Sequence, residues 1–339
     1  GRMVAELEAQ GSRHIAYPVH RKSPSSLLRI PGLARQLRDL APDVVHVRSR
    51  IPAWMVYLAV KRLSSGERPA LVSTFHGLYS VSRYSQIMGC GDRVIAISEC
   101  VQDYVHQNYP AIDRDRIRLI HRGVDTQQFN RSQAASPEWR DTFFARHRQL
   151  RDVPLLLMPG RLSRWKGQTA FIELMASLAR DGVHCHGLVV GESEPGKEAY
   201  LEELRERVHG SGLVQRVSFL GHRSDMADLY ALSTLVFNLS ERPEPFGRTV
   251  IEALAVGTPV VAWNAGGPAE SLRDACPEGL VPPGDIAALS AVTRQMLERP
   301  SRVTLPDAFT LKAQADATLS VYQEVLADAA LAQATVARN

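Results

Sequence analysis

The sequence predicts an α/β protein with two doubly wound parallel-sheet domains, the first of them incomplete. The chain has 339 residues, which suits two domains of ordinary size. Hydrophobic residues make up 45% and charged residues 22%, a balance that excludes disordered and fibrous proteins. From residue 43 onward, short apolar runs alternate with amphipathic stretches, which is typical of parallel sheets covered by helices on both faces.

The apolar runs of four or five residues are the expected strands. In the first half these are Val44–Val47, Leu71–Thr74, Val94–Ile97 and Ile117–Ile120. In the second half they are Leu155–Met158, Gly187–Val190, Val217–Leu220, Leu235–Leu239 and Pro259–Ala262. The expected helices are Thr169–Arg180, Tyr200–Val208, Thr249–Val256 and an alanine-rich tail, Ala313–Ala337, with Leu319, Tyr322, Val325 and Leu326 on one face.

The start of the chain differs from that of a complete doubly wound domain, which opens with a buried strand and a glycine-containing turn. Here a helix over Met3–Gln10 comes first, followed by one extended run, His14–Val19. We therefore expect a leading strand–helix–strand unit to be absent. The polar stretch Asp125–Val153 lacks strand alternation and indicates the joint between domains. We expect domains at residues 1–135 and 136–305, with a C-terminal helix at 306–339 that packs back on the first domain.

The two halves carry opposite charge. Residues 1–150 hold 22 Lys and Arg against 13 Asp and Glu (net +9), which leaves 18 against 23 (net −5) for the rest. This asymmetry indicates an anionic partner for the first half: nucleic acid, anionic lipid or anionic glycan. Nucleic acid fits least, because the basic residues lack interleaved aromatic platforms.

The cysteine pattern and the hydropathy of the sequence indicate the cellular compartment of the protein. Cys90, Cys100, Cys185 and Cys276 are scattered with no CxxC pair, so they predict neither a disulfide framework nor a zinc site. No apolar run approaches the roughly 20 residues of a membrane span, and no signal segment opens the sequence. We expect a cytoplasmic protein whose contact with a membrane, if any, is peripheral and at its inner face.

Three segments resemble phosphate or metal motifs and are discounted. Gly191–Glu198 fits the GxxxxGK pattern, but Glu198 stands where Ser or Thr should hold magnesium. Gly89 and Gly91 begin a GxG that precedes a strand, which is the wrong context for a dinucleotide site. Asp113 and Asp115 form an Asp-x-Asp pair with interleaved arginines, which favours a solvated turn, so no metal site is expected.

The first segment expected to carry chemistry is the loop from Gly160 to Gly167, directly after an expected strand. In open α/β sheets, ligands bind at the carboxyl ends of the strands. Arg161 and Lys166 lie five residues apart in this glycine-bounded loop. Such a loop can bring two cations to one anion, for which a diphosphate is the natural choice. The alternative is two surface charges that are near each other by chance.

The second segment runs from Glu241 to Glu252 and leads from a strand into a helix. The N-terminus of that helix, at Gly247, presents backbone N–H groups suited to an anionic or oxygen-rich ligand. Glu252 lies one turn further, among apolar residues, where a carboxylate needs hydroxyl or cationic partners. A ribose diol would serve, and so would a structural pairing with a nearby arginine.

The loop with Arg161 and Lys166, followed by Glu244 and Glu252, resembles the retaining glycosyltransferases of the two-Rossmann-domain GT-B fold, in particular their large "group 1" family. The segments Gly266–Glu270 and Gly279–Asp285 are similar to that family's Gly-Gly-x-x-Glu turn and its closing Pro-Gly-Asp segment. The order of motifs agrees from about residue 70 to residue 300.

The resemblance implies a donor site for a nucleotide sugar, with a UDP-sugar favoured and no cofactor or metal. Arg161 and Lys166 would hold the diphosphate, Glu252 the ribose hydroxyls, and Glu244 the hydroxyls of the donor sugar. The implied donor-binding set is Gly160, Arg161, Lys166, Gly191, Leu220, Gly221, Glu244, Phe246, Gly247, Arg248, Thr249 and Glu252. Loops after Val190 and at Leu220–His222 would frame the base.

In the first half, His76 and Gly77 resemble the family's His-Gly turn, whose histidine faces the sugar near the reacting carbon. With Arg161, Lys166 and Glu244, His76 completes the implied catalytic set. The expected acceptor side comprises Arg48, Arg50, His76, Gly77, Arg83 and Arg122, with Arg21 and Lys22 as further cations. Residues 78–85 resemble a branch associated with lipopolysaccharide-core and cell-surface glycan synthesis. A phosphorylated, lipid-linked glycan is the expected acceptor.

The family's reaction retains anomeric configuration, and the departing phosphate itself takes the acceptor proton, so no protein nucleophile is expected. Other activities on the same pattern remain open at this point. A sugar-nucleotide epimerase would need no acceptor, and a non-catalytic nucleotide-sugar-binding protein would need no reaction at all. A glycan phosphorylase would need a buried lysine for pyridoxal phosphate, and no lysine stands out for that purpose.

Overall fold

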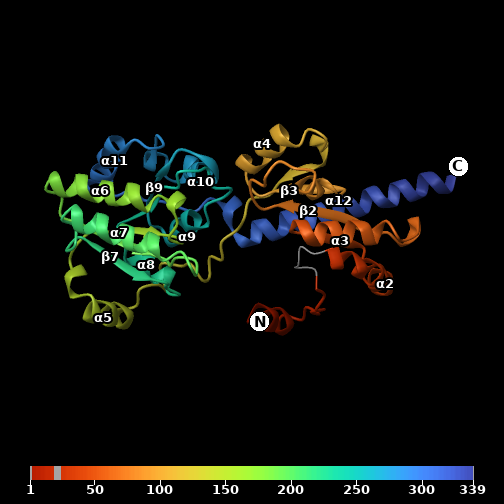
Figure 1. The fold of residues 1–339 in the computed structure, drawn as a ribbon, viewed down its shortest axis with the longest axis horizontal. Helices are drawn as coiled ribbons and strands as arrows, with labels where there is room; N and C mark the ends of the chain where they lie inside the picture. The colour runs from red at the N-terminus through yellow and green to blue at the C-terminus, as the bar shows by residue number, and fades with distance from the viewer. Residues whose placement is uncertain (1, 19–23, 339) are drawn as a thin grey trace. The chain divides into compact units, whose positions relative to one another are not determined.

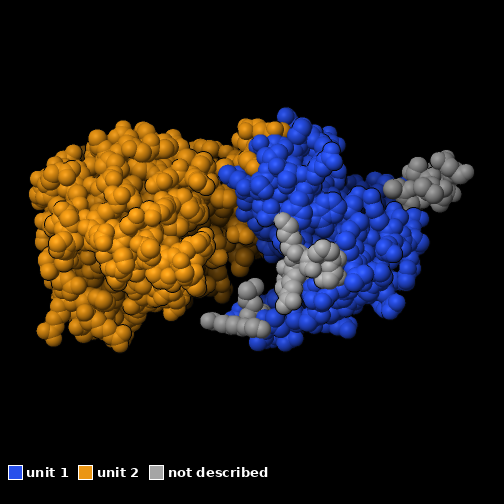
Figure 2. Space-filling model, in the orientation of Figure 1, with its two compact units in different colours: residues 1–95, 108–118, 321–339 blue, residues 96–107, 119–320 orange. Residues whose placement is uncertain are grey.

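The computed structural model describes residues 2–18 and 24–338 (Figure 1). The chain divides into two compact units (Figure 2). Unit 1 comprises residues 1–95, 108–118 and 321–339, and unit 2 comprises residues 96–107 and 119–320. Each unit is built around its own sheet, and the two sheets confirm the predicted α/β class.

The first sheet has four strands in the order β1-β2-β3-β4. They are β1 (Val44–Val47), β2 (Ala70–Phe75), β3 (Arg93–Ala96) and β4 (Ile117–Leu119). The helices of this part are α1 (Arg2–Ala9), α2 (Ile30–Leu40), α3 (Arg50–Val60) and α4 (Glu99–Asn108). β1 and β2 run parallel, with His46 paired in register to Val72. Parallel pairing places the carboxyl ends of both strands at the same edge.

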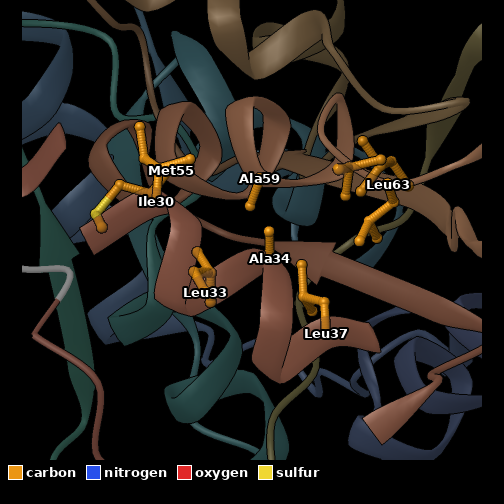
Figure 3. Close-up of a cluster of buried hydrophobic side chains, with 9 residues drawn as sticks. Ile30, Leu33, Ala34, Leu37, Met55, Ala59 and Leu63 are labelled. Carbon is orange, nitrogen blue, oxygen red and sulfur yellow. The ribbon is translucent and has the colours of Figure 1, made fainter. Parts of the chain in front are cut away.

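Part of the core of unit 1 lies where α2 packs on α3 (Figure 3). Ile30, Leu33, Ala34 and Leu37 recur at helical spacing in α2, which gives this helix one apolar face. Figure 3 shows Ala34 and Ala59 directed toward one another. Small side chains at a crossing allow two helices to approach closely.

The second sheet has six strands in the order β10-β9-β8-β5-β6-β7, and all of its neighbouring strands pair in parallel. The strands are β5 (Leu155–Pro159), β6 (His186–Val190), β7 (Val217–Gly221), β8 (Leu235–Asn238), β9 (Val260–Trp263) and β10 (Leu280–Val281). The helices are α5 (Pro137–Arg146), α6 (Gln168–Arg180), α7 (Ala199–Gly210), α8 (Met226–Leu232), α9 (Arg248–Val256), α10 (Gly266–Ala275) and α11 (Ile286–Glu298). Strand order reverses at β5, which lies between β8 and β6. Ligands bind at such switch points in open α/β sheets.

The expected strands coincide with the observed ones to within two residues, because continuous apolar runs of this length are a strong signal for buried parallel strands. β10 was not anticipated, since two residues give no periodicity. The run at His14–Val19 forms no strand over residues 14–18, and Val19 lies outside the described residues. In the described part of the chain, no helix combines the length and the apolar character needed to cross a membrane.

The tail helix α12 (Leu311–Arg338) forms as predicted, but its predicted apolar face was wrong in part. Val321 and Val325 are buried, whereas Leu319 and Leu326 are 56% and 40% exposed. The buried stripe contains Val325, as expected, together with Val321, which lies four residues earlier and therefore on the same face of the helix. Glu324, between them in sequence, forms ion pairs with Arg93 and Arg118 of unit 1.

The buried His186 makes the stability of unit 2 depend on pH. Its Nε2 lies 2.9 Å from the hydroxyl oxygen of Ser218. Burial, with a smaller effect of Arg216, lowers the pKa of His186 from 6.5 to about 4. A lowered histidine pKa means that the unfolded chain binds the proton first, so stability falls as pH falls through 6.5 toward 4.

We predict that the free energy of unfolding falls by about 1–2 kcal/mol between pH 7 and pH 5 through His186 alone. In urea titrations at both pH values, His186→Gln should lose less stability than the wild type. His209→Gln, at an exposed position, is the matched control and should keep the wild-type pH dependence. Equal pH dependence in His186→Gln and the wild type would show that His186 does not carry this effect.

Candidate functional site

The loop from Gly160 to Gly167 leaves the carboxyl end of β5 and is fixed at both ends. At its start, the Gly160 N–H donates to the carbonyl of Val190 in the neighbouring strand β6 at 2.8 Å. At its end, Gly167 adopts φ +82°, and a Cβ atom there would lie 1.8 Å from the carbonyl oxygen of Leu239. Only glycine allows this close approach. The two cations of the loop are thereby attached to a rigid strand edge.

Arg161 points from this loop toward the segment after β6. Its guanidinium forms an ion pair with Glu194, and its side chain is half exposed. Hydrogen bonding from Lys197 and the charge of Arg161 lower the pKa of Glu194. The GxxxxGK-like segment therefore supplies a carboxylate that faces Arg161, and Lys197 is engaged with the same carboxylate.

Lys166 lies closer to the interior. Its Nζ is 2.5 Å from the Oε1 of Glu244, with side-chain exposures of 20% and 9% respectively. Ser240 donates its hydroxyl to the same carboxylate oxygen, and the ammonium lies 4.4 Å from the centre of the Trp165 ring. The structure thus brings Lys166 and Glu244 together, but Arg161 and Lys166 have different carboxylate partners rather than a common one.

Glu252 lies in the second turn of α9 and is buried. It accepts hydrogen bonds from the Tyr230 hydroxyl at 3.0 Å and from Arg248 at 3.1 Å. Burial raises the pKa of Glu252, an effect that Arg248 and Tyr230 partly oppose. The expectation of cationic or hydroxyl partners for this carboxylate is confirmed, and both partners come from the chain itself.

A cavity of about 330 Å³ lies at the switch point of the second sheet. It brings together five residues of the predicted donor set: Gly160, Arg161, Gly191, Thr249 and Glu252. The rest of its lining is Pro159, Val190, Glu192, His222, Arg223, Met226 and Tyr230. Sequence reasoning missed Tyr230 and Met226, which lie within an ordinary amphipathic helix and carry no motif.

The other predicted donor residues lie outside this lining. Gly221 borders a neighbouring cavity of about 430 Å³ together with Gly191, and Leu220 borders neither. The Phe246 side chain is 3% exposed and packs near His121 and Phe309. Gly247 caps α9 with φ +80°, and a Cβ atom there would lie 2.7 Å from the Cγ of Pro268.

Two residues of the motifs found in the sequence, Glu270 and Asp113, form hydrogen bonds with the backbone of the chain. The carboxylate of Glu270 accepts the backbone N–H groups of Glu99 and Cys100 at 2.8 and 2.6 Å, at the first turn of α4. The carboxylate of Asp113 accepts the N–H of Asp115 at 3.0 Å and closes a short turn. Among the described residues, no group of three or more His, Cys, Asp or Glu side chains is arranged to hold a metal ion.

In unit 1, part of the predicted acceptor set gathers at the carboxyl ends of β1 and β2. Arg48 donates from Nε to the Nε2 of His76 at 3.2 Å. Arg50 lies over the rings of Tyr79 and Tyr84, at 4.9 and 5.3 Å from their centres.

The remaining acceptor-side residues are placed as follows. Gly77 follows β2 directly after His76, and Arg83 is exposed in the next segment. Arg122 belongs to unit 2 rather than unit 1, so it is not part of the cluster at β1 and β2. Arg21 and Lys22 lie outside the described residues.

Comparison with known proteins identifies the family. The model of the family described as "Glycosyl transferases group 1" matches residues 140–315, and that of "Glycosyltransferase Family 4" matches residues 4–128. The chain belongs to the group 1 glycosyltransferases. The match covers more than half of the chain and contains the 330 Å³ cavity with the Arg161 loop and Glu252.

Three curated relatives illustrate the range of the family. The chain is 34% identical over 181 residues to mannosylfructose-phosphate synthase of Agrobacterium fabrum (52% of this chain, 38% of the relative). It is 32% identical to the lipopolysaccharide core biosynthesis mannosyltransferase LpsB of Rhizobium meliloti (49% and 50%). It is 30% identical to a GDP-mannose-dependent phosphatidylinositol monomannoside mannosyltransferase of Mycobacterium tuberculosis (79% and 71%). The chain thus spans half or less of the length of two of these relatives.

Solved structures agree on the fold. A glycosyltransferase from Rickettsia africae superimposes with a TM-score of 0.83 at 27% identity, covering 96% of this chain and 88% of that one. The Anabaena HepE protein, solved with UDP-glucose, superimposes with a TM-score of 0.70 at 25% identity, covering 99% and 89%.

The close approach at Gly167 leads to a stability prediction. Gly167→Ala should destabilise the protein by more than the roughly 1–2 kcal/mol of a left-handed alanine, because the added methyl group meets the Leu239 carbonyl. Gly182→Ala is the matched control: its φ is +73°, and nothing lies within 4 Å of the added Cβ. Urea denaturation should give a larger loss for Gly167→Ala than for Gly182→Ala. Equal losses would mean that Gly167 is not held against the Leu239 carbonyl.

Proposed function

We propose that the protein is a retaining glycosyltransferase that moves a sugar from a nucleoside-diphosphate sugar to a glycan or glycolipid acceptor. The observation that carries this proposal is the 330 Å³ cavity at the switch point, where Arg161 and Glu252 line one space. A guanidinium suits a diphosphate, and a carboxylate suits the hydroxyls of a ribose. Membership of the group 1 family supports the same chemistry.

The donor binds with its diphosphate on the loop after β5. Arg161 holds the diphosphate as a planar fork, and Lys166 adds a point charge from the far end of the loop. Glu244, oriented by Ser240 and Lys166, accepts hydrogen bonds from the donor sugar. The base lies beside Gly191 and His222 in the same cavity. We favour a UDP-sugar, which is supported by the UDP-glucose found with the Anabaena relative.

In the reaction, the bond between the anomeric carbon and the diphosphate oxygen breaks, and an acceptor hydroxyl oxygen bonds to that carbon on the same face. The acceptor proton passes to the departing phosphate oxygen. Arg161 and Lys166 stabilise the negative charge that develops on the diphosphate, as preorganised cations do in other leaving-group sites. With these two cations in place, we propose that the transfer needs no metal. We propose His76 as a further catalytic residue of this transfer.

The acceptor is a phosphorylated or otherwise anionic glycan, bound through Arg48, Arg50 and Arg83. The net charge of +9 over residues 1–150 supports an anionic acceptor and a peripheral contact with an anionic membrane at its cytoplasmic face. The functional division into residues 1–135 for the acceptor, 136–305 for the donor and 306–339 as a C-terminal helix that packs on the first domain stays a prediction. A role in lipopolysaccharide or cell-surface polysaccharide synthesis is suggested by the name of the Rhizobium relative.

Binding of UDP tests the donor site without knowledge of the acceptor. At 100 times its dissociation constant, UDP should stabilise the wild type by about 2.7 kcal/mol, seen as a rise in melting temperature. Arg161→Ala should abolish most of this rise, because the diphosphate loses its fork of donors, while changing the melting temperature of the protein alone little. Lys166→Ala should also reduce the rise, but it leaves the carboxylate of Glu244 unpaired and should lower the melting temperature by itself.

Arg164→Ala is the matched control in the same loop. Arg164 is 72% exposed and pairs with Glu203, away from the cavity. The UDP-induced rise should survive this change. If Arg161→Ala kept the full rise, or if Arg164→Ala lost it, the diphosphate would not bind where proposed.

A further inference from the structure

Two pairs of side chains link the first two strands at their carboxyl ends: one pair lies within β1 and β2, and the other lies one residue beyond them. The His46 Nε2 lies 2.6 Å from the Thr74 hydroxyl oxygen, and one step further along, Arg48 donates to the Nε2 of His76 at 3.2 Å. Arg48 follows β1 directly and lies two residues after His46, and His76 follows β2 directly and lies two residues after Thr74. The pair His46–Thr74, called the inner pair below, is therefore the direct neighbour of the pair Arg48–His76.

A tyrosine of the tail helix α12 contacts the histidine of the inner pair. The Tyr322 hydroxyl oxygen lies 2.7 Å from the Nδ1 of His46, and the two rings meet edge to face with centres 5.7 Å apart. The adjacent Val321 and nearby Val325 are buried, which fixes this stretch of the helix. Three elements that are distant in sequence thus meet at one imidazole.

The chemistry of this imidazole sets the direction of the chain of hydrogen bonds. Burial and the charge of Arg48 lower the pKa of His46 to about 4, so the ring is neutral near pH 7 and has one donor and one acceptor nitrogen. A phenol is a stronger donor than an aliphatic hydroxyl because it is more acidic. Tyr322 therefore donates to Nδ1, and the Nε2–H of His46 donates to Thr74.

We propose that His46 and Tyr322 are positioning residues for His76: they hold the ends of β1 and β2 so that Arg48 donates to Nε2 of His76, which places the ring proton on Nδ1. The hydrogen bond at one ring nitrogen of a histidine sets which nitrogen carries the proton, and therefore which nitrogen can donate to a ligand. The importance of this arrangement for glycosyl transfer rests on the proposed function. The tautomer of His76 can be measured whether or not that function is correct.

The test is long-range ¹H–¹⁵N NMR of the full chain labelled with ¹⁵N-histidine, with the His76 signals assigned from a His76→Gln spectrum. In the wild type near pH 7.5, the Nδ1–H form of His76 should exceed the Nε2–H form by about fivefold, the ratio that a net hydrogen bond of about 1 kcal/mol gives. Tyr322→Phe removes only the hydroxyl and should reduce this ratio by at least about half. A predominantly Nε2–H form in the wild type would overturn the proposal, and this measurement needs no variant.

Tyr57→Phe is the matched control, since Tyr57 lies on α3 and its ring packs under Lys61. It should leave the His76 ratio at the wild-type value. If Tyr322→Phe and Tyr57→Phe both keep the wild-type ratio, Tyr322 does not position His76. Failure of the donor proposal would appear instead as an absent UDP-induced rise in melting temperature, with the His76 tautomer unchanged.

Discussion

Charged side chains held at an apolar sheet edge are the constraint on which the proposed donor site depends. Lys166 and Glu244 are both largely buried, and an unpaired charge there would cost several kcal/mol. Their ion pair, with the Ser240 hydroxyl, gives each charge a partner beside the carboxyl ends of β5 and β8. Glu252 meets the same requirement through Tyr230 and Arg248. A polyanionic ligand with hydroxyls can replace or join these internal partners, so the fold maintains a polar site at the switch point of its sheet.

Much of this could be predicted from the sequence because the signals are local. Apolar runs located the strands, and the glycine-bounded loop located Arg161 and Lys166 at a strand end. The ion-pair partners of these two residues lie far away in the sequence, so no local sequence pattern predicts them. The pairing of Arg161 with Glu194 and of Lys166 with Glu244 joins residues 33 and 78 positions apart. Tyr230 reaches Glu252 from another helix. The prediction of the buried face of α12 was wrong in part because an alanine-rich helix has several weak apolar stripes. Which of them is buried depends on the packing.

In unit 1, too, charged side chains at the ends of strands, here β1 and β2, have partners within the chain. Arg48 and Arg50 are held by a histidine and by aromatic rings rather than by carboxylates in the interactions described above. Such cations keep their charge for an outside anion, which fits the basic character of this half of the chain. The neutral His46 between Tyr322 and Thr74 shows how a buried imidazole can link a helix to a strand without introducing a further charge.

The most direct test of the central claim is a crystal structure of the protein with UDP. The account predicts that the diphosphate lies within hydrogen-bonding distance of the side chains of Arg161 and Lys166, and that a ribose hydroxyl donates to the carboxylate of Glu252. UDP bound elsewhere, with Glu252 still engaged only by Tyr230 and Arg248, would contradict it.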